Sequence, residues 1–112
     1  PAFTDTTAHW AKESVGTAAA HGLVSGYDQN TFGPDDRITR EQAASIVAWA
    51  AGLQAGEEPL NFSDARQVSP WALSSVAATI NNAYLSGYPD NSFRPRDYTS
   101  RAEAATIIAK LL

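Results

Sequence analysis

The sequence predicts an all-α fold built from two tandem helix–loop–helix repeats. Three observations predict it: the second half repeats the first, apolar residues recur at helical spacing in both halves, and helix-capping signals recur at matching places. The repeats occupy residues 1–53 and 61–112, and residues 54–60, with Gly56 and Pro59, form a linker. Because one helix pair exposes too much apolar surface to stand alone, each repeat is expected to bury its face on a neighbour.

The duplication is visible as an alignment of the two halves. It begins with Phe3-Thr4-Asp5 against Phe62-Ser63-Asp64. After a loop that is longer in the second copy, a gap-free alignment runs from Trp10 and Trp71 to Ile46 and Ile107. Its identical pairs include Val15 and Val76, Ser25-Gly26-Tyr27 and Ser86-Gly87-Tyr88, Phe32 and Phe93, Pro34 and Pro95, Asp36 and Asp97, and Arg40 and Arg101.

Each repeat is predicted to open with a helix. In the second repeat Ser69 suits the N-cap and Pro70 the first helical position. An apolar stripe follows at Ala72, Val76, Ile80 and Ala83, and the first repeat has a weaker one at Ala11, Val15, Ala18-Ala19 and Leu23. We expect Gly22 to end the first of these helices.

A structured loop is predicted next in each repeat. Tyr88-Pro89-Asp90-Asn91 has proline at the second position, as a type I turn prefers, whereas Tyr27-Asp28-Gln29-Asn30 is a weaker turn signal. The two phenylalanines that follow, Phe32 and Phe93, are predicted to be buried.

The second helix of each repeat is predicted to start with a capping box. Thr39-Arg40-Glu41-Gln42 and Ser100-Arg101-Ala102-Glu103 both fit the Ser/Thr-x-x-Glu/Gln pattern. The predicted apolar faces are Ala43, Ile46, Val47 and Ala50 in one helix and Ala104, Ile107, Ile108 and Leu111 in the other.

Composition disfavours several classes of function. The net charge is −4, with 8 Lys and Arg against 12 Asp and Glu, so nucleic-acid binding is not expected. No apolar run approaches the ~20 residues that span a bilayer, so no membrane insertion is expected. With 0 Cys there are no disulfides and no thiolate metal sites. We expect no cofactor and no metal: Asp28-x-Asn30 resembles the start of an EF-hand, but Phe32 and Thr39 stand where carboxylates are required.

Catalysis is also not expected. The chain has 2 His, His9 and His21, and neither recurs in the second repeat. Without Cys or a Gly-x-Ser-x-Gly sequence, a nucleophilic triad lacks support. Duplicated features favour multivalent binding over one active site.

The ordered motifs of both halves resemble the S-layer homology family over nearly the whole chain. They are Phe-x-Asp, a Trp-Ala helix start, Ser-Gly-Tyr, Asn-x-Phe-x-Pro and a Thr-Arg-Ala-Glu-like second helix, each present twice. The resemblance implies a module that holds surface proteins to bacterial cell walls by binding secondary cell-wall polysaccharides, often pyruvylated. It also implies a pseudo-threefold helical bundle of three repeats with sugar-binding grooves between them, so the third must come from a partner chain or the parent chain.

The resemblance makes Arg40 and Arg101 the main candidate contacts to the polymer. Both stand at the first position of a helix, where the helix dipole disfavours a cation. A guanidinium beside free N–H groups would be a good receptor for a carboxylate such as that of a pyruvate ketal. The alternative is that each arginine pairs with a nearby Asp36 or Asp97.

The other candidate ligand-binding residues each have two interpretations. Trp10 and Trp71 either stack on a sugar ring or, as we favour, anchor the first helix in the core. Gly26-Tyr27 and Gly87-Tyr88 either line a groove, with glycine allowing a positive φ or close ligand approach, or serve the turn. Asp5 and Asp64 either accept sugar hydroxyls or cap backbone N–H groups.

The predicted function is therefore a secreted, non-catalytic anchoring module at the bacterial cell surface that binds an anionic cell-wall polysaccharide. The alternative is a protein–protein assembly module, in which exposed apolar faces mediate self-association and glycan binding is weak or lost.

Overall fold

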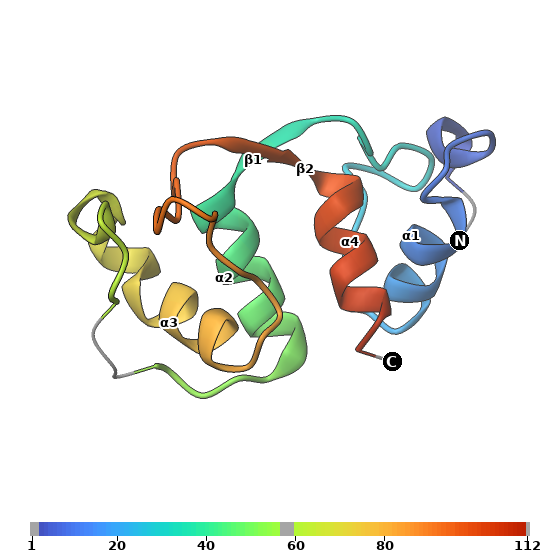
Figure 1. Cartoon of the computed structure of the whole chain (residues 1–112). Helices are drawn as coiled ribbons and strands as arrows, with labels where there is room; N and C mark the ends of the chain where they lie inside the picture. The colour runs from blue at the N-terminus through green and yellow to red at the C-terminus, as the bar shows by residue number, and fades with distance from the viewer. Residues whose placement is uncertain (1–2, 57–59, 112) are drawn as a thin grey trace. The chain divides into compact units, whose positions relative to one another are not determined.

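The structure is a computed structural model that describes residues 3–56 and 60–111. The predicted α-rich fold is confirmed: four α-helices account for most of the regular structure in the described ranges (Figure 1). Short 3-10 helices lie at Thr4–Thr6, Ala65–Gln67 and Pro70–Ala72. The α-helices are α1 (Lys12–Ala20), α2 (Arg40–Ala51), α3 (Leu73–Asn81) and α4 (Arg101–Ala109).

Two short strands were not predicted from the sequence. β1 (Arg37–Thr39) and β2 (Tyr98–Ser100) pair in a two-stranded sheet. Each lasts three residues and leads directly into a helix, so its last residue is also the helix N-cap. A segment this short is below the length at which alternation of polar and apolar residues can be recognised.

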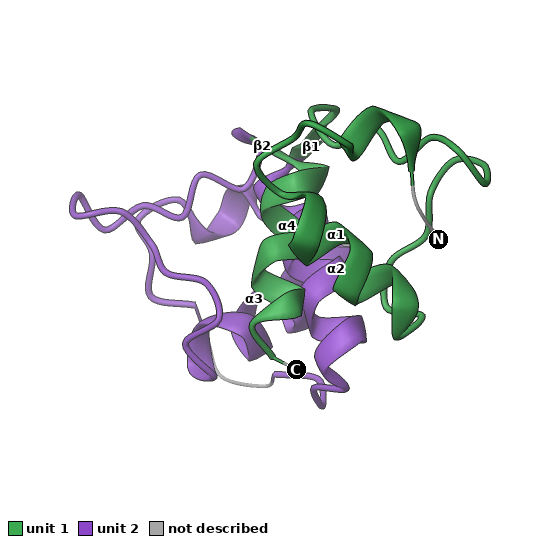
Figure 2. Cartoon of the chain, turned by 90° about the vertical axis from the view of Figure 1, so that its right-hand side faces the viewer, with its two compact units in different colours: residues 1–38, 99–112 green, residues 39–98 purple. Residues whose placement is uncertain are grey.

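The chain divides into two compact units (Figure 2). Unit 1 contains residues 1–38 and 99–112, and unit 2 contains residues 39–98. Unit 1 therefore pairs α1 with α4, and unit 2 pairs α2 with α3. Each unit combines the first helix and loop of one sequence repeat with the second helix of the other, so the repeats and the compact units divide the chain differently.

The core of unit 1 is built from aromatic and small side chains. Phe3 and Phe32 pack with ring centroids 5.4 Å apart. Fully burying each such ring contributes roughly 1.5–3 kcal/mol. Around them lie Ala11 and Val15 of the α1 region, Ala102 and Ala105 of α4, and, partly buried, Ala19 and Val24.

The core of unit 2 has the same plan with larger side chains at its edge. Phe62 and Phe93 lie 5.5 Å apart, and the predicted burial of Phe32 and Phe93 is confirmed. Ile80 and Leu85 pack where unit 1 has Ala19 and Val24. The buried members are Ala44, Val68, Ala72, Val76 and Phe93, with Leu60, Phe62, Ile80 and Leu85 packed against them.

The start of α2 confirms the predicted capping box. Thr39 accepts from the backbone N of Gln42, whose side chain accepts from the backbone N of Thr39 at 2.8 Å. At α4 only half of the box forms: Ser100 accepts from Glu103, but the Glu103 carboxylate accepts from Thr99 Oγ1. Both helices nevertheless begin where the sequence predicts.

The prediction that Ser69 caps the next helix was wrong. Ser69 precedes the 3-10 helix Pro70–Ala72, and its side chain makes no cap hydrogen bond there. Its backbone N and Oγ instead donate to the buried carboxylate of Glu41, at 2.9 and 2.6 Å. A buried carboxylate needs hydrogen-bond donors. The Ser69 hydroxyl therefore donates to Glu41 and does not cap the helix.

The ends of α1 and α3 have the same geometry but different residues. Gly22 follows α1 with φ 72°, as predicted for a helix-ending glycine. Leu23 N bonds to Ala18 O, which closes the turn. In the second repeat the equivalent residue is Ala83, with φ 61°. Ala83 is exposed, so its predicted place in the apolar stripe was wrong.

The predicted apolar faces of α2 and α4 are shifted. The buried apolar residues of α2 are Ala43, Ala44, Val47 and Ala48, whereas Ile46 and Ala50 are half-buried. In α4, Ala102, Ala104, Ala105 and Ile108 are buried, Ile107 is half-buried, and Leu111 lies beyond the helix. Small residues face the partner helix because they allow close packing. Of the predicted linker, residues 57–59 lie outside the described residues.

Candidate functional site: two loop-bound arginines

Arg101, at the start of α4, is bound to the loop of unit 1. Its Nε donates to Phe32 O at 3.0 Å and its Nη2 to Ser25 O at 2.7 Å. The guanidinium carbon lies 4.7 Å from the ring centre of Tyr27 and 4.5 Å from that of Phe32. The cation is therefore held by two carbonyls and two aromatic rings.

Arg40, at the start of α2, makes the same contacts in unit 2. Its Nε donates to Phe93 O and its Nη2 to Ser86 O, both at 2.8 Å. Its guanidinium carbon lies 4.8 Å from the ring centre of Tyr88 and 4.6 Å from that of Phe93. The duplication of the sequence is thus a duplication of one contact geometry.

The structure corrects two expectations about these arginines. Within the described part of the chain neither forms an ion pair, so pairing with Asp36 or Asp97 is wrong. The helix starts do not present free N–H groups either, because loop carbonyls accept them: Arg40 N bonds to Asp97 O, and Arg101 N to Asp36 O. Any anion receptor here rests on the guanidinium itself, which forms no ion pair with a described residue.

Asp5 and Asp64 hold the loop backbone in both units. The Asp5 carboxylate accepts from Phe32 N at 3.0 Å and Gly33 N at 2.8 Å. Asp64 accepts from Phe93 N at 2.9 Å and Arg94 N at 2.8 Å. The backbone hydrogen bonds from Phe32 and Gly33 lower the pKa of Asp5 below its usual 3.8. Of the two interpretations, backbone capping is the one these contacts match, although the partners are distant in sequence.

Gly26 and Gly87 are required by packing. Neither has a positive φ, which corrects that expectation. A Cβ on Gly26 would overlap the Phe3 ring, and one on Gly87 would overlap the Phe62 ring. The close approach at these glycines is therefore made by the chain's own aromatic core.

The tyrosines that follow lie beside the arginines but differ in their partners. Tyr27 is exposed, and its hydroxyl donates to Asp36 Oδ2 at 2.7 Å. This hydrogen bond raises the pKa of Tyr27. Tyr88 is half-buried and lies under Arg40 and a second arginine, Arg94.

Trp10 and Trp71 are not core residues, so the favoured interpretation of both was wrong. Their exposed fractions are 67% and 59%. The next residue in each case, Ala11 or Ala72, is buried at 2% or 0%. The crowded position at the start of the helix is filled by the small side chain, and the indole is directed outward, available to a ligand or partner.

Arg94 is the residue of this region that sequence reasoning missed. It lies next to the predicted Phe93 and Pro95, with φ 57° and its guanidinium carbon 3.9 Å from the Tyr88 ring centre. The signal was present in the alignment, where Arg94 stands opposite Gly33 and Arg96 opposite Asp35.

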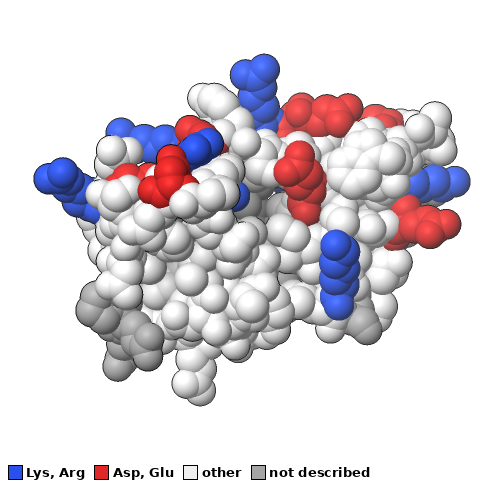
Figure 3. Space-filling view, viewed as in Figure 1, with Lys and Arg blue, Asp and Glu red and all other residues white. Residues whose placement is uncertain are grey.

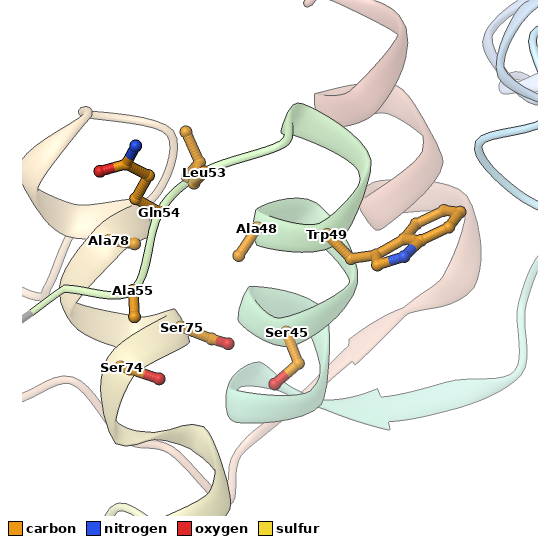
Figure 4. Close-up of a pocket in the computed structure, with 9 residues that line it drawn as sticks. All are labelled: Ser45, Ala48, Trp49, Leu53, Gln54, Ala55, Ser74, Ser75 and Ala78. Carbon is orange, nitrogen blue, oxygen red and sulfur yellow. The ribbon is translucent and has the colours of Figure 1, made fainter.

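Two pockets lie near these elements. In unit 1 an open pocket of about 740 Å³ borders the loop at Ser25, Gly26, Asp28, Gln29 and Asn30. In unit 2 a pocket of about 220 Å³ lies between α2 and α3; Ser45 and Ser75 point toward each other across it, and the Trp49 ring points away (Figure 4). Neither pocket is lined by Lys or Arg, so neither supplies the cation for an anionic ligand.

Among the described residues, no three or more His, Asp or Glu side chains are grouped so that they could hold a metal ion. Asp28 Oδ1 accepts from Asn30 N and Thr31 N, at 2.7 and 2.8 Å, which is a backbone turn. Both ring nitrogens of His9 are engaged, with Asp35 Oδ1 at 2.7 Å and Ala11 N at 3.1 Å.

The charged surface is mixed. On the face shown in Figure 3, Lys and Arg side chains stand beside Asp and Glu, without one continuous basic area. No helix in the described part of the chain is long and apolar enough to cross a membrane.

Taken together, the helical repeats and the duplicated arginine contacts define the chain as a two-repeat α-helical module. Comparison with known proteins matches the S-layer homology domain at residues 2–44 and again at residues 61–105. The chain belongs to the S-layer homology family, whose members occur in cell-surface and cell-wall proteins.

Curated relatives support this assignment. Cell surface glycoprotein 1 of Acetivibrio thermocellus is 32% identical over 93% of this chain and 5% of that protein. The middle cell wall protein of Brevibacillus brevis is 33% identical over 90% of the chain and 10% of its own length. The cellulosome-anchoring protein of Acetivibrio thermocellus is 29% identical over 93% of the chain and 24% of its own length. The chain thus spans a small part of each relative.

Proposed function

We propose that this chain is a non-catalytic module that anchors a parent protein to the bacterial cell wall by binding an anionic secondary cell-wall polysaccharide. The observation that carries the proposal is the paired arginine geometry. Arg40 and Arg101 each donate Nε and Nη2 to loop carbonyls, and among the described residues no hydrogen bond engages Nη1, which we assign to the ligand. A guanidinium positioned this way matches a carboxylate such as that of a pyruvate ketal.

Two further features support a saccharide ligand. Trp10 in unit 1 and Trp71 in unit 2 are exposed and offer apolar ring faces. Two binding sites on one chain raise retention on a polymer through effective concentration, without requiring high affinity at each site. The name of one relative, a cellulosome-anchoring protein, agrees with this function.

The test is co-sedimentation with purified cell-wall sacculi, before and after acid stripping of the secondary polysaccharide. We expect the chain to bind intact sacculi and to lose binding after stripping. Binding that survives stripping, or no binding to either preparation, would contradict the proposal.

The arginine variants make the test specific. Arg40→Ala and Arg101→Ala each remove a charge-assisted bond worth about 1.5–3 kcal/mol, so each should weaken binding at least tenfold. Each also loses two bonds to loop carbonyls, so binding must be measured below the unfolding transition and corrected for the folded fraction. Exposed Arg66 is the control for charge, since Arg66→Ala should change binding little.

Self-association is a second candidate function, favoured by exposed apolar side chains in unit 2. Trp49 on α2 is 69% exposed and Leu73 at the start of α3 is 43% exposed. Sedimentation equilibrium over a range of concentrations tests this candidate, and the monomer mass at all concentrations would remove it.

A further inference from the structure

We propose that the two arginine sites are unequal, and that Arg94 is a specificity-determining residue that directs an acidic saccharide to the site in unit 2. This inference rests on the proposed function and extends it by assigning the anion to one of the two sites.

The geometry in unit 2 places two cations on one aromatic ring. The guanidinium carbons of Arg94 and Arg40 lie 3.9 and 4.8 Å from the ring centre of Tyr88. Their separation is at most the sum of these distances, close to the Debye length of about 8 Å at physiological salt. Their repulsion is therefore only partly screened, and an anion that contacts both relieves it.

A single carboxylate offsets part of this charge. Asp90 Oδ2 accepts from Arg94 Nη2 at 3.2 Å, and Ser92 Oγ accepts from Arg94 Nε at 3.1 Å. Hydrogen bonds from Ser92 lower the pKa of Asp90, so this carboxylate stays ionised at neutral pH. Arg40, Arg94 and Asp90 together keep one net positive charge. The Arg94 side chain is 42% exposed and accessible to a ligand.

The same position in unit 1 is built differently. Gly33 stands where Arg94 stands, and a Cβ there would overlap the Tyr27 ring. That ring also carries the hydroxyl that donates to Asp36 at 2.7 Å. The cation Arg101 therefore has a carboxylate near the Tyr27 ring, and the described residues place no second arginine on that ring, so an anion should be held less strongly here than in unit 2.

The charges of the two loops show the same difference. Residues 27–36 contain three Asp and no Lys or Arg, whereas residues 88–97 contain two Asp and two Arg. An acidic saccharide thus meets a less negative loop in unit 2 than in unit 1.

Backbone conformation provides an independent observation. Arg94 has φ 57°, a region that disfavours side chains, and Gly33 has φ 72° in the first repeat. Glycine suits this turn, so the arginine occupies it against the backbone preference. At a side chain that also contacts Tyr88 and Asp90, this strain supports a purpose other than stability.

The experiment compares Arg94→Gly with the parent chain in equilibrium binding to sacculi that carry their secondary polysaccharide. Arg94→Gly relieves the positive φ but loses the contacts to Asp90 and Ser92, so its Tm should stay close to that of the parent. Binding should weaken about threefold to tenfold, as for a partly exposed charged contact, and its dependence on salt should decrease. Arg96→Ala is the control, since it removes an equal charge from the same loop and should change binding less than twofold.

The comparison of the two sites completes the test. Arg40→Ala should weaken binding more than Arg101→Ala. If Arg94→Gly binds as tightly as the parent while Arg40→Ala loses binding, the inference is wrong and the proposed function stands. Equal losses for Arg94→Gly and Arg96→Ala would overturn it too, by indicating a general charge effect. If the parent itself fails to bind the sacculi, the proposed function falls and this inference with it.

Discussion

Among single residues, Asp5 and Asp64 show how a side chain can organise the loop that holds an arginine. Each carboxylate accepts two consecutive backbone N–H groups on the far side of the repeat, at Phe32–Gly33 or Phe93–Arg94. These are the same loop segments whose carbonyls hold Arg101 and Arg40. The aspartate therefore positions the phenylalanine carbonyl, and the carbonyl positions the guanidinium.

Asp5→Asn tests this role through pH. The folded-state pKa of Asp5 is lowered, so its contribution to stability is present above the ordinary pKa of 3.8 and is lost as pH falls through the lower folded-state value. At pH 7 the variant should have a Tm a few degrees lower, because an amide has one acceptor oxygen for two donors.

Thermal unfolding followed by circular dichroism between pH 7 and pH 2 measures this difference. The gap between parent and Asp5→Asn should narrow below pH 3.8. Asp97→Asn, at an exposed carboxylate, is the control. A gap that is constant over the whole range would show that ionisation of Asp5 does not matter.

At the scale of elements, the helix ends record how the two repeats have diverged. Both α1 and α3 are followed by a left-handed residue, Gly22 or Ala83. The hydrogen bonds are alike, with Leu23 N bonded to Ala18 O and Tyr84 N bonded to Thr79 O. Only glycine adopts this conformation without a steric penalty. The same turn in the second repeat is therefore strained at Ala83.

Ala83→Gly should therefore stabilise the protein. Relief of the left-handed strain, less the greater freedom of glycine in the unfolded chain, gives about 0.5–1 kcal/mol. Chemical denaturation measures it as a higher midpoint with an unchanged slope. The matched control is Gly22→Ala, where a Cβ meets nothing within 4 Å, so that loss of stability would come from φ alone. A lower midpoint for Ala83→Gly would contradict the strain argument.

At the scale of the whole chain, the packing partners cross between the sequence repeats. Unit 2 is one continuous segment, residues 39–98, whereas unit 1 joins residues 1–38 to residues 99–112. Neither sequence repeat contains a complete helix pair from one unit. The second helix of each repeat instead covers the first helix of the other, as expected for repeat units that cannot bury their apolar faces alone.

Fragments of the chain test this division. Residues 39–98 contain the whole core of unit 2, so this fragment should keep α2 and α3 and unfold cooperatively. The sequence repeat 61–112 contains α3 and α4, which pack in different units, and should be largely unfolded. Far-UV circular dichroism with urea titration measures both. If fragment 61–112 were folded and fragment 39–98 unfolded, the division into these two units would be wrong.

Local signals were enough to predict the helices, the duplication and the capping box at Thr39, because they depend on residues within a few positions of one another. Family membership also followed from the order of short motifs. The packing partner of each helix could not be predicted in this way, since the residues of one helix do not specify which apolar face covers them.

Tertiary structure alone decided what the candidate site looks like. Arg40 reaches a carbonyl 53 residues away and Arg101 one 76 residues away. The exposure of Trp10 and Trp71, the burial of Glu41 against Ser69, and the stacking of Arg94 on Tyr88 likewise depend on distant or folded neighbours. Spacing along a sequence reports periodicity and caps, whereas these contacts are made only when burial of the apolar faces brings separate segments together.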